Sequence, residues 1–226
     1  MSSQNMSLIS LLGFILGIFS LLFPVYPNLA KGNQANQGYV PPNKDKKQQN
    51  AVNSGSRGCP GQPVNITPLI PKNHIPTTIS TRPIFLFLVK SKPERTVRFS
   101  LVEPGRSQPL WEQELTVEKP GVLSVSTPAH VSLKIDRKYI WNLVVVCNPT
   151  RPSENWYIRA MVKRIPLSQQ LAEKLDRANS YYEKASIFAL SGIWYDALAT
   201  SYFAQSESKA ISYFQQLLTE INLDLI

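Results

Sequence analysis

Short apolar runs broken by turn residues fill the middle of the chain. Between Val64 and Ile165 these runs recur every eight to twelve residues, separated by Pro, Gly, Ser and Asn. This spacing is typical of strands in an all-β sandwich or barrel. The clearest strand, 137–147, places Tyr139, Trp141 and Cys147 on one face, because alternate residues of a strand point the same way. We therefore predict about seven antiparallel strands.

The two aromatic residues Tyr139 and Trp141 allow two interpretations. They either pack in the core of an immunoglobulin-like or fibronectin-like sandwich, or form a platform on which carbohydrate rings stack. Inward-facing aromatic residues with a period of two are usually core residues, which favours the first interpretation.

After the β-region the hydrophobic period becomes that of helices. Ser180 and Glu183 have the spacing of a capping box that opens a helix, and Gly192 would end it. Residues 178–204 fit part of the tetratricopeptide pattern of small and aromatic residues. One such repeat cannot bury its own apolar face. We therefore predict an α+β fold in which a partly tetratricopeptide-like helical tail, 166–226, packs on the sandwich.

The N-terminal part of the chain has the pattern of a targeting segment and a tether. Residues 8–23 are an uncharged apolar run, so 1–30 is predicted to be either a signal peptide or an N-terminal membrane anchor. Residues 31–58 are mostly Asn, Gln, Gly, Pro and Lys, a composition typical of a disordered basic linker. We expect the protein to be exported to the periplasm, the extracellular space or the cell envelope, and an uncleaved segment would anchor it to the membrane.

The sequence has two cysteines, Cys59 and Cys147, at the start and near the end of the predicted β-domain, 59–165. An even number of cysteines in an exported protein favours a disulfide. The alternative is two separate buried thiols, which would be expected in a cytosolic protein.

Positive charge is concentrated in the β-domain. The net charge of the whole chain is +9, with +4 in 31–58, +8 in 59–165 and −3 in 166–226. Such a balance attracts anionic polymers or lipid surfaces, and the alternative is that it only keeps an exported domain soluble. No nucleic-acid partner is expected.

The sequence contains no recognisable reactive cluster. Its two histidines, His74 and His130, have no Cys or His at ligand spacing, so we predict no metal site and expect both to be surface residues. There is no nucleophile elbow and no Gly-rich loop before a helix. We therefore identify no catalytic, cofactor-binding or metal-binding residue, and whether the protein is an enzyme stays open.

Several short sequence motifs are spaced along the chain. They are Arg57–Cys59, Pro68–Pro71, Thr78–Pro83, Pro120–Ser126, Lys138–Trp141, Cys147–Pro149 and Ala189–Leu198. As a set, spread over roughly residues 57–223, they resemble the domain-of-unknown-function family 928, which is found mainly in cyanobacteria. The resemblance implies an export signal, a β-domain with two cysteines and a helical tail. It implies no activity.

Three roles are compatible with these patterns. The first is a non-enzymatic binding or scaffolding module of the cell envelope, whose tail meets a protein partner through Trp194, Tyr195 and Asp196. The second is a sensor or binder of an anionic polymer or lipid, based on the charge of the β-domain. The third is an envelope enzyme whose carboxylates the sequence does not reveal.

Overall fold

The computed structural model describes residues 38–42, 53–54, 59 and 64–223. All of them belong to one compact unit, Asn36–Ile226. The predicted signal peptide or membrane anchor, 1–30, lies outside the described residues. No helix within the described ranges has the length and apolar character needed to cross a membrane.

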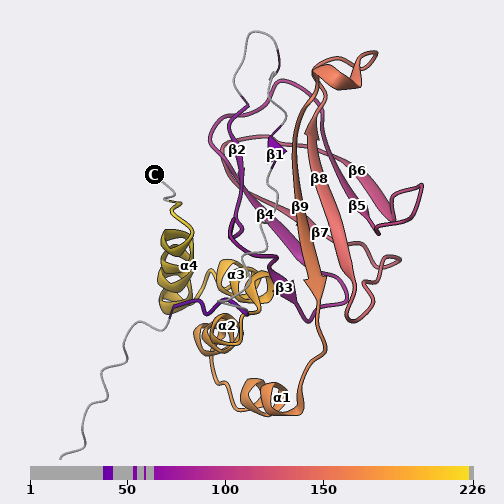
Figure 1. Cartoon of the computed structure of the whole chain (residues 1–226). Coiled ribbons are helices and arrows are strands. Elements are labelled where there is room, and N and C mark those ends of the chain that lie inside the picture. The colour runs from indigo at the N-terminus through magenta and orange to yellow at the C-terminus, as the bar shows by residue number, and fades with distance from the viewer. Residues whose placement is uncertain (1–37, 43–52, 55–58, 60–63, 224–226) are drawn as a thin grey trace, which may run out of the picture. The chain divides into compact units, whose positions relative to one another are not determined.

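The described residues form an α+β fold with two sheets and four C-terminal helices (Figure 1). The larger sheet has the order β1-β9-β8-β5-β6, and β3 pairs with β9 in parallel while every other pairing is antiparallel. Its strands are β1 (Asn53–Ser54), β3 (Thr77–Thr78), β5 (Val97–Val102), β6 (Trp111–Leu115), β8 (Lys138–Val145) and β9 (Trp156–Arg164).

The smaller sheet is antiparallel and has the order β2-β4-β7. Its strands are β2 (Ile66–Pro68), β4 (Ile84–Val89) and β7 (Gly121–Ser126). A short 3-10 helix, η1 (Pro152–Glu154), lies in the connection between β8 and β9. In Figure 1 this connection lies at one end of the sheets, and helices α1, α2 and α3 lie toward the other end.

An aromatic cluster joins the inner faces of the two sheets. Phe85 and Phe87 of β4 contact Phe99 of β5 and Trp141 of β8, with ring centroids 4.9 Å apart for Phe85–Phe99 and 5.4 Å apart for Phe87–Trp141. Tyr139 and Trp141 are each 1% exposed, which confirms the core interpretation of these two residues. Such edge-to-face and tilted ring pairs add to the hydrophobic stabilisation of the core.

Four helices follow the sheets, and α2 begins and ends where the sequence predicts. They are α1 (Gln169–Asp176), α2 (Tyr181–Leu190), α3 (Trp194–Phe203) and α4 (Ser208–Glu220). The Ser180 hydroxyl accepts a hydrogen bond from the backbone N–H of Glu183, as expected for an N-cap. Gly192 adopts a φ of 75° between α2 and α3, a left-handed conformation that glycine takes without a steric penalty.

The described residues within 31–58 contact the rest of the chain. Residues 38–42 lie against the helices, where the backbone N–H of Val40 donates to the carbonyl oxygen of Ala189 at 3.1 Å. Asn53 and Ser54 form β1 at the edge of the larger sheet.

The predicted disulfide between Cys59 and Cys147 is present. It closes a loop across a sequence separation of 88 residues and fixes Cys147 just after the end of β8. Closing a loop of this length lowers the entropy of the unfolded chain.

Replacing both cysteines by serine is expected to lower the free energy of unfolding by about 2–5 kcal/mol, because the unfolded chain gains conformational entropy. Urea denaturation of the double variant and of the wild type under non-reducing conditions measures the difference. Wild type treated with a reductant should match the double variant, and equal stability of all three would contradict the structural role of the bridge.

Candidate functional site

The larger sheet carries an open groove on the face that points away from the core, with a cavity volume of about 470 Å³. We call it the outer-face groove. Its polar lining comes from strands β5, β6, β8 and β9 and from the β8–β9 connection. These polar side chains are Arg98, Ser100, Glu112, Asn142, Asn155 and Arg159.

A row of hydrogen-bonded side chains crosses the floor of the groove. The strand register places Ser100 beside Asn142 and Asn142 beside Arg159. The Nε of Arg159 donates to Oδ1 of Asn142 at 2.8 Å, and Nδ2 of Asn142 donates to Oγ of Ser100 at 3.1 Å. Because a guanidinium only donates, it fixes the orientation of the Asn142 amide. The row therefore holds the Arg159 guanidinium in a defined position on a rigid sheet.

A second row lies one step along the strands and combines charge with an apolar surface. Arg98 forms ion pairs with Glu112 at 3.6 Å and with Glu114 at 3.1 Å. Val144 lies between Arg98 and Tyr157 in the register, and the Tyr157 side chain is 39% exposed. Two arginines and one glutamate line the groove, which leaves it a net charge of +1. The positive charge of Arg98 is largely balanced by its own neighbours, whereas Arg159 contacts a neutral amide.

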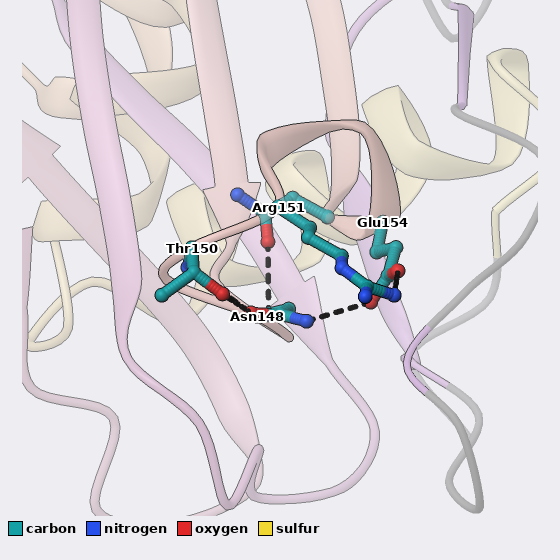
Figure 2. Close-up of polar contacts among 5 residues, drawn as sticks. Asn148, Thr150, Arg151 and Glu154 are labelled. Atoms are coloured by element: carbon teal, nitrogen blue, oxygen red, sulfur yellow. Dashed lines mark hydrogen bonds and ion pairs between the residues drawn. The ribbon is translucent and has the colours of Figure 1, made fainter.

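The β8–β9 connection forms one wall of the groove and is organised by its own side chains (Figure 2). The Asn148 side chain donates from Nδ2 to Glu154 Oε2 at 2.8 Å and accepts from the Thr150 hydroxyl, also at 2.8 Å. Arg151 Nη1 contacts the other oxygen of Glu154 at 3.2 Å. Figure 2 shows these four residues facing one another around the turn. Because these bonds already hold the loop in one conformation, the loop would lose little conformational entropy if a ligand bound against it.

Asn155 and the disulfide hold the start of this connection. Asn155 Oδ1 accepts hydrogen bonds from the backbone N–H groups of Cys147 at 2.9 Å and Asn148 at 3.2 Å. Pro149 and Pro152 then line the groove from the connection. The disulfide joins Cys147, at the start of the same connection, to Cys59.

Trp194 and Tyr195, for which we predicted partner contacts, are buried at the junction between α3 and the sheets. The indole N–H of Trp194, a fully buried residue, donates to the carbonyl oxygen of Leu69 at 2.8 Å. The Tyr195 hydroxyl accepts from Trp141 Nε1 at 2.8 Å and donates to the carbonyl oxygen of Met161 at 3.3 Å. The structure therefore places both side chains in contacts within the chain, and they are not presented to a partner.

Asp196 completes the same junction. Its Oδ2 accepts a hydrogen bond from the backbone N–H of Ile79 at 3.2 Å, in the segment that follows β3. Burial raises the pKa of this carboxyl to about 6, and hydrogen bonds from Thr78, Ile79 and Ser80 oppose that rise. The carboxyl therefore titrates in a mildly acidic range while it holds a helix to a strand.

His74 is buried rather than exposed, contrary to our expectation for a residue in a Pro-rich loop. Its Nε2 lies 2.6 Å from the Tyr39 hydroxyl and its Nδ1 lies 2.7 Å from Asn73 Oδ1. Burial lowers its pKa, so the ring is neutral at pH 7. Within the described part of the chain, no three His, Cys, Asp or Glu side chains gather as metal ligands.

Sequence reasoning did not single out the groove residues. Arg98 and Ser100 share one face of β5, and Tyr157 and Arg159 share one face of β9, opposite the core residues of each strand. The same alternation is found on any solvent-facing sheet surface. Only the register between strands shows that these pairs are neighbours.

The fold and the groove define an α+β protein with a polar site on the outer face of its larger sheet. The chain matches the family model of the domain of unknown function DUF928 over residues 52–226, and it belongs to this family. Comparison with curated proteins and with solved structures found no match.

The raised pKa of Asp196 predicts a pH-dependent stability. The folded-state pKa is about 6 and the ordinary value is 3.8, so between these values the folded state binds more protons than the unfolded state. The free energy of unfolding should therefore fall as the pH rises from about 4 to about 6, by up to about 3 kcal/mol from this residue.

Urea denaturation of D196N at pH 4, 5, 6 and 7 tests this assignment. The fall in stability over this range should be smaller in D196N than in the wild type. E220Q is the matched control, because burial also raises the pKa of the Glu220 carboxyl, and its loss should remove a separate contribution. A D196N profile parallel to that of the wild type would show that Asp196 does not titrate in this range.

Proposed function

We propose that this protein is an exported, non-enzymatic binding module of the cell envelope and that the outer-face groove is its ligand site. The observation that carries the proposal is the row Ser100–Asn142–Arg159, in which each side chain is held by the next. Residues fixed on interior strands lose little conformational freedom when a ligand binds, which favours recognition. Export through 1–30 is part of the proposal and fits the disulfide, which is typical of oxidising compartments.

We also propose that the two sheets form an immunoglobulin-like sandwich and that α2 and α3 form a tetratricopeptide-like pair. An immunoglobulin-like sandwich is supported by the two facing sheets and by Trp141 in the core of the larger one. A tetratricopeptide-like arrangement of α2 and α3 is supported by Ala185, Ala189 and Ala197, which are fully buried small residues that let two helices approach closely.

The ligand must be recognised by side chains at this site. Strands β5, β8 and β9 are paired on both sides in the sheet, so their backbone groups are already used in the ladders. An extended peptide that adds to a sheet needs a free edge instead. A saccharide chain suits the groove better, because its hydroxyl groups can bond to planar polar side chains such as Asn142 and Arg159. Its apolar ring faces can lie on Tyr157.

Charge selects a class of saccharide. Arg159 is not neutralised by a carboxylate in the hydrogen bond that holds it, and a carboxylate on a ligand would form a charge-assisted, bidentate pair with it. The positive charge of the β-domain would attract the same ligand over a longer range. We therefore propose an acidic polysaccharide, one whose sugar units carry carboxyl groups, as the ligand.

R159A should weaken binding of an oligogalacturonate by roughly tenfold or more, because a hydrogen bond to a charged partner contributes about 1.5–3 kcal/mol. Isothermal titration calorimetry with the full chain measures the dissociation constant, and the affinity should decrease as salt is added.

R106A is the matched control for R159A. Arg106 is exposed, lies in the turn after β5 and is not part of the groove lining, so the variant loses the same charge elsewhere. Equal losses for both variants would mean that binding is non-specific charge attraction. Absence of binding by the wild type to oligogalacturonate would reject the acidic class, and a neutral maltohexaose tested in parallel would show whether the groove takes uncharged saccharides.

A further inference from the structure

The segment Gly38–Pro42 occupies a site on the helices that is separate from the outer-face groove. Tyr39 is its anchor: the Tyr39 hydroxyl contacts His74 Nε2 at 2.6 Å, and its ring packs edge-on against Trp194 with centroids 4.8 Å apart. We call the surface that receives it the Tyr39 site. It is formed by His74, Ala189, Gly192, Trp194 and Glu220.

The backbone of the segment is recognised as well as its side chain. The N–H of Tyr39 donates to Glu220 Oε2 at 2.7 Å, and the N–H of Val40 donates to the carbonyl oxygen of Ala189 at 3.1 Å. Two successive backbone donors bonded in this way hold the segment in one register. This combination of backbone bonds and a side-chain pocket is how extended peptides are bound in general.

The walls of the Tyr39 site are held by bonds that do not involve the segment. Trp194 donates to Leu69, His74 bonds to Asn73, and the carbonyl oxygen of Gly192 accepts from the Thr77 hydroxyl at 2.8 Å. These bonds tie the site to the sheets. The site should therefore keep its shape when Tyr39 leaves it.

The segment and the site fit closely. A Cβ atom on Gly192 would lie 3.0 Å from the carbonyl oxygen of Val40 and 3.2 Å from the Pro42 ring. A Cβ atom on Gly38 would meet the Glu220 carboxylate, the end of a flexible side chain, which would have to shift. The absence of a side chain at Gly192 thus permits the close approach of Val40 and Pro42.

The chemistry of the anchor depends on neutral partners. Burial lowers the pKa of His74, which favours the neutral ring, and Asn73 Oδ1 beside Nδ1 favours the tautomer in which Nε2 accepts a hydrogen bond from the tyrosine. Burial also raises the pKa of the Tyr39 hydroxyl above its ordinary value, so the hydroxyl remains a donor. A phenylalanine would fill the same space but would leave His74 Nε2 without this donor.

We propose that the Tyr39 site is a peptide-binding site for extended segments of the type Gly-Tyr-Val-Pro, and that the chain's own Gly38–Pro42 is its intramolecular ligand. Because the segment is covalently linked to the site, its effective concentration there is of the order of millimolar, and an external peptide must compete with it. The chain is thus closed to such peptides until its own segment leaves.

Y39A in the full chain tests the proposal, because it removes the anchor and leaves the walls of the site intact. The probe is the peptide Gly-Tyr-Val-Pro-Pro, acetylated and amidated at its ends, titrated by calorimetry. Y39A should bind it saturably, and the wild type should bind it about tenfold or more weakly because of competition in cis. The same peptide with alanine in place of tyrosine should not bind Y39A.

Equal affinities of Y39A and the wild type, or no binding by a folded Y39A at millimolar peptide, would overturn the proposal. Circular dichroism and thermal denaturation establish that the variant is folded. If Y39A does not fold, Y39L retains an apolar side chain at the site but lacks the hydroxyl, and it should also bind the peptide more tightly than the wild type. A Y39L that binds no better than the wild type would then reject the site.

Discussion

The hydrogen bond from the Trp141 indole to the Tyr195 hydroxyl is the contact on which the rest of the structure depends. Trp141 is at the centre of the aromatic core between the two sheets, and its N–H needs a partner because it is buried. The Tyr195 hydroxyl, on α3, accepts this hydrogen bond and itself donates to the carbonyl oxygen of Met161 in β9. Loss of the tyrosine hydroxyl would leave a buried donor unsatisfied, at a cost of about 1–3 kcal/mol.

The residues on either side of Tyr195 extend this junction. Trp194 bonds to the segment after β2, and Asp196 bonds to the segment after β3. The first turn of α3 is therefore attached to both sheets by three consecutive side chains. This attachment places the helices at one end of the sheets (Figure 1). The outer face of the larger sheet, which carries the groove, is not covered by them. The helices thus leave that surface of the sheet open.

Most of the strands and helices could be predicted because their patterns are local. The alternation in β8 and β9 and the N-cap at Ser180 each depend on residues only a few positions apart in the sequence. The disulfide followed from having two cysteines and an expected oxidising compartment. These predictions need no knowledge of which elements are neighbours.

The candidate sites could not be predicted, because both depend on distant neighbours. The row Ser100–Asn142–Arg159 exists only through the register of three strands. The Trp194 and Tyr195 side chains were expected to meet a partner because of the partial tetratricopeptide pattern, but in the structure they are buried against the sheets of the same chain. Tyr39 was overlooked because it is one aromatic residue in a polar segment, and its burial depends on a pocket formed far along the chain.

The most direct test of the account is to map a bound saccharide on the full chain by NMR. Amide and side-chain shifts of the isotope-labelled protein would be followed as oligogalacturonate is added. The account predicts changes in β5, β8, β9 and the β8–β9 connection, with the Asn142 side-chain amide and the Arg159 Nε–H among the signals that move most. Changes confined to the helices, or spread evenly over the positive residues of the β-domain, would contradict the assignment of the outer-face groove as the ligand site.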